Sequence, residues 1–201
     1  LYVDKSCVDE YRLLLERHIV DVMTPNQFEL ELLCDNPIHS LTDLKHSINF
    51  IHKKFKVKYV VVSLVVGLDG LDDKYIYCAI LAGTGLVEMF QVPLIKSYFT
   101  GVGDLFSALL VDRLHSFGSS TDSLEVLRRS VSQVLTVVAK TLKLTHTLGS
   151  RAAQRSGKTS GTMNDGSSMK YFELRIIQAR DFYNYNGEGD YKAVEMDKFL
   201  Q

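Results

Sequence analysis

Residues 98–106 read Tyr-Phe-Thr-Gly-Val-Gly-Asp-Leu-Phe, and this stretch decides how the whole chain is interpreted. Gly101 and Gly103 allow open or left-handed backbone geometry, and they precede an apolar run with helical periodicity. The unpaired N–H groups at the start of such a helix hold phosphate well. Asp104 is placed to accept a proton from a hydroxyl during phosphoryl transfer. Taken alone, Gly-x-Gly-Asp more often indicates a plain loop with a capping Asp.

On both sides of this turn, apolar periodicity predicts alternating helices and strands. Helices are expected over residues 7–17, 27–33, 41–55, 105–117, 124–144 and 169–182. Strands are expected over residues 19–23, 58–64, 74–81 and 87–93. Gly83-Thr84-Gly85 is expected to form a hairpin turn between the last two strands. A strand–helix–strand order followed by a hairpin predicts an α/β sheet with an antiparallel edge.

Polar segments separate these elements. Ser40 and Asp43 form a start that resembles a capping box for the third helix. Residues 149–168 are rich in Gly, Ser, Thr and basic side chains and have no apolar period, which predicts a mobile surface loop. In the last helix, Leu174, Ile177 and Phe182 are expected to face inward.

The composition is that of an ordinary globular domain. The chain has 201 residues, of which 46% are hydrophobic and 23% charged, and its formal net charge is -1. This balance gives no indication of a nucleic-acid or acidic-membrane partner. The longest apolar stretch, residues 59–66, is far too short to span a bilayer. Cys7, Cys34 and Cys78 fit no zinc spacing and no disulfide framework, which predicts a reducing compartment, the cytoplasm or the nucleus.

Three segments carry a resemblance to a known family. The run Phe99–Ala108 resembles the ribokinase-superfamily signature, and its Asp-Leu-Phe-Ser-Ala continuation is close to the pyridoxal kinase branch. Met23–Leu33 begins Met-Thr-Pro-Asn-Gln-Phe-Glu and is similar to that branch's Thr-Pro-Asn-Gln-Phe-Glu motif. Glu173–Gln178 is similar to the C-terminal helix of eukaryotic members. The chain therefore resembles the pyridoxal kinases, and the fungal branch in particular.

This resemblance implies a ribokinase-like three-layer α/β/α sandwich, with a mostly parallel central sheet and an antiparallel edge. Residues 1–201 would form the C-terminal, nucleotide-binding and catalytic part of a single kinase domain. The family's N-terminal part carries most of the pyridoxal-binding residues and an Asp-Pro-Val-x-Gly-Asp motif. This part does not occur in the sequence, so a partial domain is expected.

The resemblance assigns the site residue by residue. Asp104 takes the place of the base that deprotonates the 5′-hydroxymethyl group of pyridoxal, and Gly101 and Gly103 match the glycines of the anion hole. The positions assigned to ATP and its phosphates are Tyr2, Thr24, Asn26, Ser63, Gly101, Val102 and Gly103. Glu29 and Thr24 match positions around Mg²⁺. Glu29 would act through metal-bound water, because Mg²⁺ keeps much of its hydration shell.

The function implied is ATP-dependent phosphorylation of pyridoxal, pyridoxine and pyridoxamine to their 5′-phosphates. The cofactors implied are ATP with Mg²⁺ or Zn²⁺ and a monovalent cation such as K⁺. The assembly implied is a homodimer with no nucleic-acid or membrane partner. Two alternatives stay open: a hydroxymethylpyrimidine-type kinase of the same superfamily, and a non-catalytic fragment that only binds nucleotide.

Some residues depart from the family pattern. Val102 stands where many members have Thr, so a hydroxyl contact is lost that Thr100 could supply. Val62 replaces a frequent Thr before Ser63. A relaxed P-loop pattern at residues 152–159 follows a predicted helix rather than a buried strand, so it is interpreted as part of the polar loop.

Overall fold

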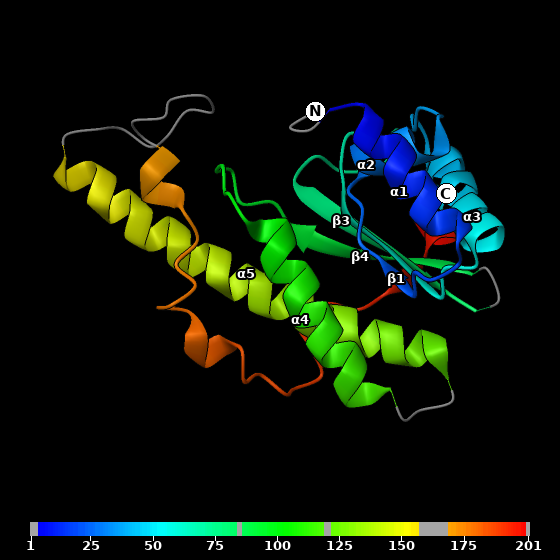
Figure 1. Cartoon of the computed structure of the whole chain (residues 1–201). Helices are drawn as coiled ribbons and strands as arrows, with labels where there is room; N and C mark the ends of the chain where they lie inside the picture. The colour runs from blue at the N-terminus through cyan, green and yellow to red at the C-terminus, as the bar shows by residue number, and fades with distance from the viewer. Residues whose placement is uncertain (1–3, 84–85, 119–121, 157–168, 200–201) are drawn as a thin grey trace. The chain divides into compact units, whose positions relative to one another are not determined.

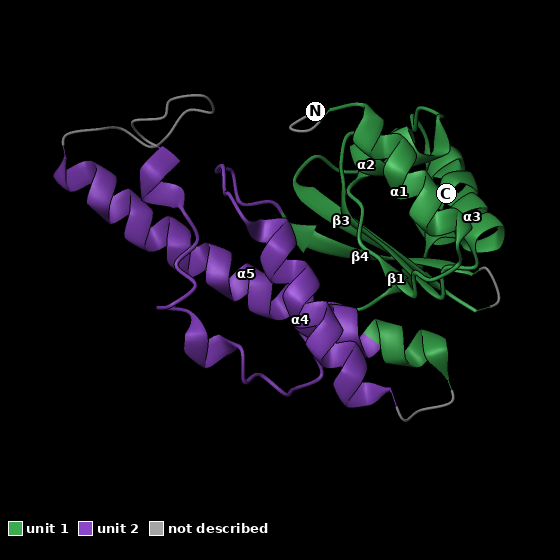
Figure 2. Cartoon of the chain, viewed as in Figure 1, with its two compact units in different colours: residues 1–93, 120–128, 192–201 green, residues 94–119, 129–191 purple. Residues whose placement is uncertain are grey.

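The structure, a computed structural model, describes residues 4–83, 86–118, 122–156 and 169–199. Tyr2 and most of the expected 149–168 loop lie outside these ranges. The chain divides into two compact units (Figure 2). Unit 1 comprises residues 1–93, 120–128 and 192–201, and unit 2 comprises residues 94–119 and 129–191.

Unit 1 contains one sheet and the first three helices (Figure 1). Its helices are α1 (Ser6–Glu16), α2 (Gln27–Cys34) and α3 (Leu41–Phe55). Its strands are β1 (Val22–Met23), β2 (Tyr59–Val65), β3 (Tyr75–Ala82), β4 (Val87–Pro93) and β5 (Val194–Glu195). The short 3₁₀ turn η3 (Met196–Phe199) follows β5.

The sheet has the order β1-β2-β3-β4-β5. The pair β1–β2 is parallel, with Val22 opposite Tyr59. The pairs β2–β3, β3–β4 and β4–β5 are all antiparallel. The α/β class is thus confirmed, but the expectation of a mostly parallel sheet is wrong for this part of the chain. The antiparallel portion is the larger one because hairpin connections join β2, β3 and β4 in sequence.

The core of unit 1 lies between the sheet and its helices. The apolar side chains Leu44, Ile48, Ile51 and Phe55 recur on one face of α3, and all four are buried, as the helical spacing predicts. α2 and α3 both pack against β2. Burying these side chains stabilises the unit by roughly 2 kcal/mol for each one. The packed sheet therefore holds the start of α2 in a fixed place beside β2.

Unit 2 contains α4 (Val102–Phe117), most of α5 (Ser123–Arg155), and the 3₁₀ turns η1 (Lys170–Phe172) and η2 (Arg180–Phe182). α5 starts in unit 1 and runs on to Arg155, so the beginning of the expected 149–168 loop is helical. The expected helix over residues 169–182 is wrong, because this segment forms only short turns. Ile177, expected to face inward, is 74% exposed.

α5 has an unusual buried face. The side chains of Ser130, Ser132, Gln133, Thr136, Thr141 and Thr145 are all buried. An unpaired buried donor or acceptor costs free energy, and most of these side chains have hydrogen-bond partners. Among the described residues, Ser130 Oγ and Gln133 Oε1 are buried without one. In the described ranges, no helix is both long and apolar enough to cross a membrane.

The three cysteines are free thiols. Burial raises the pKa of Cys34 to about 11. Burial also raises the pKa of the fully buried Cys78. Because the thiolate is the reactive form, these two side chains behave as small apolar groups rather than as nucleophiles.

Candidate functional site: the open start of α4 and the capped start of α2

The turn that the sequence singles out forms the first turn of α4. Gly101 is the N-cap, with φ 85° and ψ 11°, a left-handed conformation that glycine adopts without steric cost. The first helical bond runs from Leu105 N–H to Gly101 O at 3.2 Å. The N–H groups of residues 102–104 precede it and have no partner within the helix. No side chain caps this helix, so its start offers backbone donors to an anion.

Asp104 lies within this open turn. The helix begins earlier than the expected residue 105, so Gly103 and Asp104 both belong to the first turn of α4. The Asp104 side chain is exposed, whereas Phe106, Leu109 and Leu110 on the same helix are buried. The buried face fixes the helix, and the exposed carboxylate is presented beside the open N–H groups. A base next to oriented donors is the arrangement that phosphoryl transfer to an alcohol requires.

The second group of expected site residues surrounds the start of α2 in unit 1. Thr24 and Asn26 flank the buried Pro25 directly after β1. Asn26 is the N-cap of α2, and its Oδ1 accepts the N–H of Glu29 at 2.9 Å. In return, Glu29 Oε2 accepts the N–H of Asn26 at 2.9 Å. These reciprocal bonds form a capping box, which satisfies the helix start from within the chain.

Ser63 joins this second group through the parallel strand pair. Its N–H donates to Pro25 O at 2.9 Å, and its Oγ donates to the same oxygen at 3.4 Å. The structure therefore brings Ser63 to the turn that carries Thr24 and Asn26, as the assignment to one binding site requires. The hydroxyl bond is long, so the Oγ is held only weakly by the chain.

The start of α3 carries the same kind of cap as the start of α2, at residues that the sequence does not assign to the site. Ser40 Oγ accepts the N–H of Asp43 at 3.2 Å, and Asp43 Oδ2 accepts the N–H of Ser40 at 2.9 Å. The hydroxyl of Ser40 and the backbone N–H of His39 also donate to Asp43. The Ser40 hydroxyl bond is the main cause that holds the pKa of Asp43 below its ordinary value of 3.8. The capping box expected here is confirmed.

The expected site residues thus fall into two groups in two units. Thr24, Asn26, Glu29 and Ser63 belong to unit 1, and residues 101–104 belong to unit 2. Val102 is half-buried, and Thr100, suggested as a substitute hydroxyl, pairs with Glu173 in a parallel β-bridge. The assignment of Tyr2 falls on a residue that the structure does not describe.

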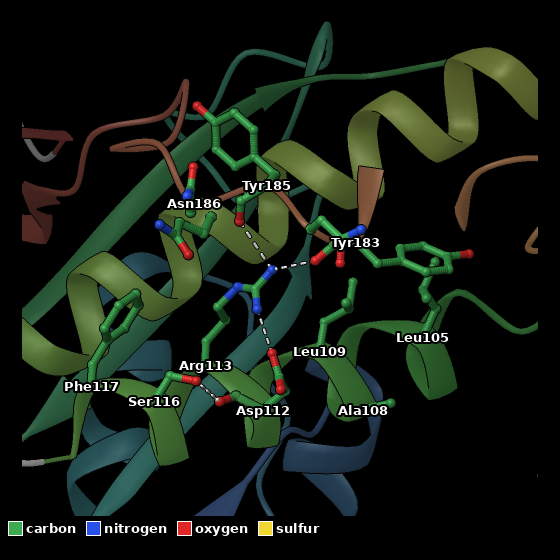
Figure 3. A pocket seen from close by; sticks show the side chains of 12 residues that line it. Leu105, Ala108, Leu109, Asp112, Arg113, Ser116, Phe117, Tyr183, Tyr185 and Asn186 are labelled. Carbon is green, nitrogen blue, oxygen red and sulfur yellow. Dashed lines mark hydrogen bonds and ion pairs between the residues drawn. The ribbon is translucent and has the colours of Figure 1, made fainter. Parts of the chain in front are cut away.

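A cavity of about 600 Å³ lies elsewhere in unit 2, along α4 (Figure 3). Its lining includes Leu109, Arg113 and Phe117 of α4 and Tyr183 and Tyr185 of the C-terminal segment. None of the site residues expected from the sequence lines it. Arg113 was not among the residues singled out from the sequence, although a lone cation within an apolar helix face signals a side chain with fixed acceptors.

Comparisons with known proteins identify the family. The model of the family described as phosphomethylpyrimidine kinase matches residues 2–151. "Putative pyridoxal kinase BUD16" of Saccharomyces cerevisiae is 39% identical over 186 residues, which cover 91% of this chain and 57% of the relative. "Putative pyridoxal kinase BUD17" of the same yeast is 33% identical over 184 residues, which cover 90% of this chain and 55% of the relative.

Among solved structures, the pyridoxal kinase from Leishmania donovani in complex with ADP and pyridoxamine matches with a TM-score of 0.71 at 23% identity. The match covers 96% of this chain and 58% of that structure, and it shows a shared fold. The chain spans little more than half the length of the curated relatives it matches. From the family match over residues 2–151, the chain belongs to the phosphomethylpyrimidine kinase family, and the relatives it resembles bear the name pyridoxal kinase.

Proposed function

We propose that the full-length protein transfers the terminal phosphoryl group of ATP to the 5′-hydroxymethyl group of pyridoxal and related vitamers, giving the 5′-phosphate. The observation that carries the proposal is the start of α4, where a left-handed glycine leaves the helix uncapped and Asp104 lies exposed in the first turn. The names of the relatives, and the complex of the Leishmania kinase with ADP and pyridoxamine, support the same substrates.

In this proposal the start of α4 performs the transfer. Asp104 accepts the proton of the attacking hydroxyl as the oxygen bonds to phosphorus and the bond from phosphorus to the leaving ADP oxygen breaks. The N–H groups of residues 102–104 donate to the oxygens of the transferring phosphoryl group and stabilise its charge. Gly101 and Gly103 allow the backbone to approach these oxygens without a Cβ in between.

In the same proposal, side chains at the start of α2 bind the phosphates of the nucleotide and the hydrated metal ion. Thr24, Asn26 and Ser63 offer hydroxyl and amide groups to the phosphates. Glu29 Oε2 already accepts the N–H of Asn26, and a carboxylate has further lone pairs for a metal-bound water. These oxygen donors favour Mg²⁺ over Zn²⁺, which prefers nitrogen and sulfur ligands.

Within the described residues, no group of three or more His, Cys, Asp or Glu side chains could hold a metal ion. A divalent ion would therefore be held chiefly by the phosphates of ATP, with Glu29 reached through water. A monovalent cation such as K⁺, a homodimer and a cytoplasmic or nuclear location belong to the same proposal, and they rest on the resemblance alone.

A second candidate is phosphorylation of a hydroxymethylpyrimidine, which the description of the matching family favours. The two candidates use the same transfer chemistry and differ in the ring that bears the hydroxymethyl group. A substrate panel on the full-length protein separates them. We expect kcat/KM for pyridoxal to exceed that for hydroxymethylpyrimidine by about tenfold or more. The reverse order would favour the second candidate, and ATP binding without turnover of either substrate would contradict both.

A further inference from the structure

Residues 173–191, which we call the strap, follow α5 in the opposite direction within unit 2 (Figure 1). Side chains from the buried polar face of α5 bond backbone groups of the strap. The pairs are Thr145 with Arg175 at 3.1 Å, Thr136 with Asp190 at 2.7 Å, Gln133 with Gly187 at 2.5 Å and Ser132 with Tyr191 at 2.5 Å. The strap thus supplies partners for three hydroxyl groups and for Nε2 of Gln133, whereas Gln133 Oε1 has no partner among the described residues.

A glycine allows the backbones of α5 and the C-terminal segment to approach closely near each end of the strap. A Cβ on Gly149 of α5 would lie 2.4 Å from the carbonyl oxygen of Tyr171, just before the strap. A Cβ on Gly189 of the strap would lie 2.1 Å from Ser132 Oγ. Any side chain larger than hydrogen would push the two segments apart at these points. The contact between the strap and α5 is therefore specific rather than incidental.

The middle of the strap is tied to α4. Arg113 donates through one nitrogen to Tyr183 O at 2.7 Å and to Tyr185 O at 3.1 Å, and it pairs with Asp112 (Figure 3). Only 12% of the Arg113 side chain is exposed. A largely desolvated guanidinium with fixed carbonyl acceptors is a strong anchor. The strap therefore connects α4 and α5 along its length.

The beginning of the strap touches the phosphate-binding turn itself. Glu173 pairs with Thr100 in a parallel β-bridge, directly before Gly101. Leu174 Cδ1 lies 3.8 Å from the position that a Cβ on Gly101 would occupy. The next residue, Arg175, is the one whose N–H is held by Thr145. One hydroxyl on α5 therefore anchors the strap directly after the two strap residues that lie against the turn.

We propose that Thr145 is a positioning residue for phosphoryl transfer: its hydroxyl accepts Arg175 N–H and so holds Glu173 and Leu174 against Thr100 and Gly101. Thr145 does not touch the reacting atoms. Its effect passes through the backbone of the strap to the N–H groups at the start of α4. This inference rests on the proposed function only for its kinetic consequence. The link between Thr145 and the turn can be measured without any substrate.

The test compares three variants of the full-length protein. Thr145→Val keeps the shape of the side chain and removes the acceptor, and Thr145→Ser keeps the hydroxyl. Thr141→Val is the matched control, because Thr141 is also fully buried on α5 but donates its hydroxyl to Val137 O within the helix, at 2.9 Å. Backbone hydrogen exchange is followed over residues 98–106 and 170–178, together with kcat and KM.

We expect Thr145→Val to speed exchange over both segments and to lower kcat about tenfold, with KM for ATP and pyridoxal changed less than about twofold. Thr145→Ser and Thr141→Val should stay close to wild type in both measurements. Equal exchange in Thr145→Val and Thr141→Val would overturn the inference, whatever the activity. Absence of kinase activity in the wild type, with the exchange difference present, would instead overturn the proposed function and leave the positioning link standing.

Discussion

At the start of α2, the side chains of Asn26 and Glu29 each accept the other's backbone N–H, whereas at the start of α4 no side chain caps the helix. α3 resembles α2, because Ser40 and Asp43 form the same reciprocal pair. A capped start satisfies its donors from its own chain. An uncapped one forgoes about 1 kcal/mol of capping stabilisation and keeps its donors for a ligand. The difference supports the proposed role of the α4 start, whose N-cap is a left-handed glycine; α1 also lacks a side-chain cap, but its N-cap, Lys5, has ordinary helical geometry.

The largest effect is expected from removing the charge of Asp104. Asp104→Asn should lower kcat by roughly a thousandfold, because the amide cannot accept the substrate proton. The Kd for ATP should change less than about threefold, because the backbone donors remain. Steady-state kinetics and calorimetry measure the two quantities. Asp35→Asn, which changes an exposed carboxylate of unit 1 outside the expected site, serves as the control and should have wild-type turnover. Near-normal turnover in Asp104→Asn would exclude this residue as the base.

The two glycines of the α4 start should respond differently to a methyl group. A Cβ on Gly103 meets no atom within 4 Å, so Gly103→Ala should leave the free energy of unfolding unchanged or slightly raised. We expect its kcat to fall about tenfold to a hundredfold, because the Cβ separates the backbone from the phosphoryl oxygens.

Gly101 has φ 85°, so Gly101→Ala should also lower the free energy of unfolding, by about 1–2 kcal/mol. Urea unfolding and kinetics on both variants provide the check. If Gly103→Ala kept full activity, the close approach of phosphate to this turn would be refuted.

A smaller effect, on the magnesium requirement, is expected when the α2 cap is changed but not when the α3 cap is changed. Glu29→Gln and Asp43→Asn both keep an oxygen that can accept the N-cap N–H, so both helices should stay capped. If Glu29 contacts a metal-bound water, Glu29→Gln should raise the Mg²⁺ concentration for half-maximal activity by about tenfold. Asp43→Asn should leave it unchanged. A magnesium titration at fixed ATP measures this, and equal responses of the two variants would remove Glu29 from the metal site.

The smallest expected effect is a pH dependence of the free energy of unfolding that arises from Asp43 in the α3 cap. The pKa of Asp43 in the folded protein lies below its ordinary value of 3.8, chiefly because Ser40 donates to it. Its stabilising contribution is therefore present above that value and is lost as the pH falls through the folded pKa. Urea unfolding of the wild type and Asp43→Asn between pH 2 and pH 6 tests this. The two proteins should differ near pH 6 and converge at the acid end, and a difference independent of pH would contradict the assignment.

Local signals in the sequence predicted the helix starts well. A capping box needs only a side chain and a partner within one turn, so Ser40 with Asp43 could be recognised without tertiary information. The Gly101–Gly103 turn was recognised for the same reason. The antiparallel pairing of β3 with β4 was predicted from the expected hairpin, whereas that of β2 with β3 was not, because their apolar patterns are compatible with either direction.

The C-terminal segment shows where local patterns fail. Leu174, Ile177 and Phe182 have the spacing of a helix face, yet the segment forms the strap: its backbone bonds close only short turns between residues 175 and 185, and the N–H groups of Arg175 and Asp190 bond side chains of α5. The sequence signal that could have revealed the strap lies in α5, the helix against which the strap packs. Thr136 and Thr145 are polar side chains on the buried face of a long helix, and their need for partners predicts a backbone alongside them.

The most direct measurement follows the backbone amide signals of residues 102–104 and of Asp43 by NMR while the non-hydrolysable nucleotide AMP-PNP is titrated into the full-length protein with Mg²⁺. The open start of α4 predicts that the amides of Val102, Gly103 and Asp104 shift together and saturate with a common Kd. The capped start of α3 predicts no shift of the Asp43 amide. Unchanged signals at residues 102–104 at saturating nucleotide, or an equal shift at Asp43, would contradict the assignment of the α4 start as the phosphate-binding site.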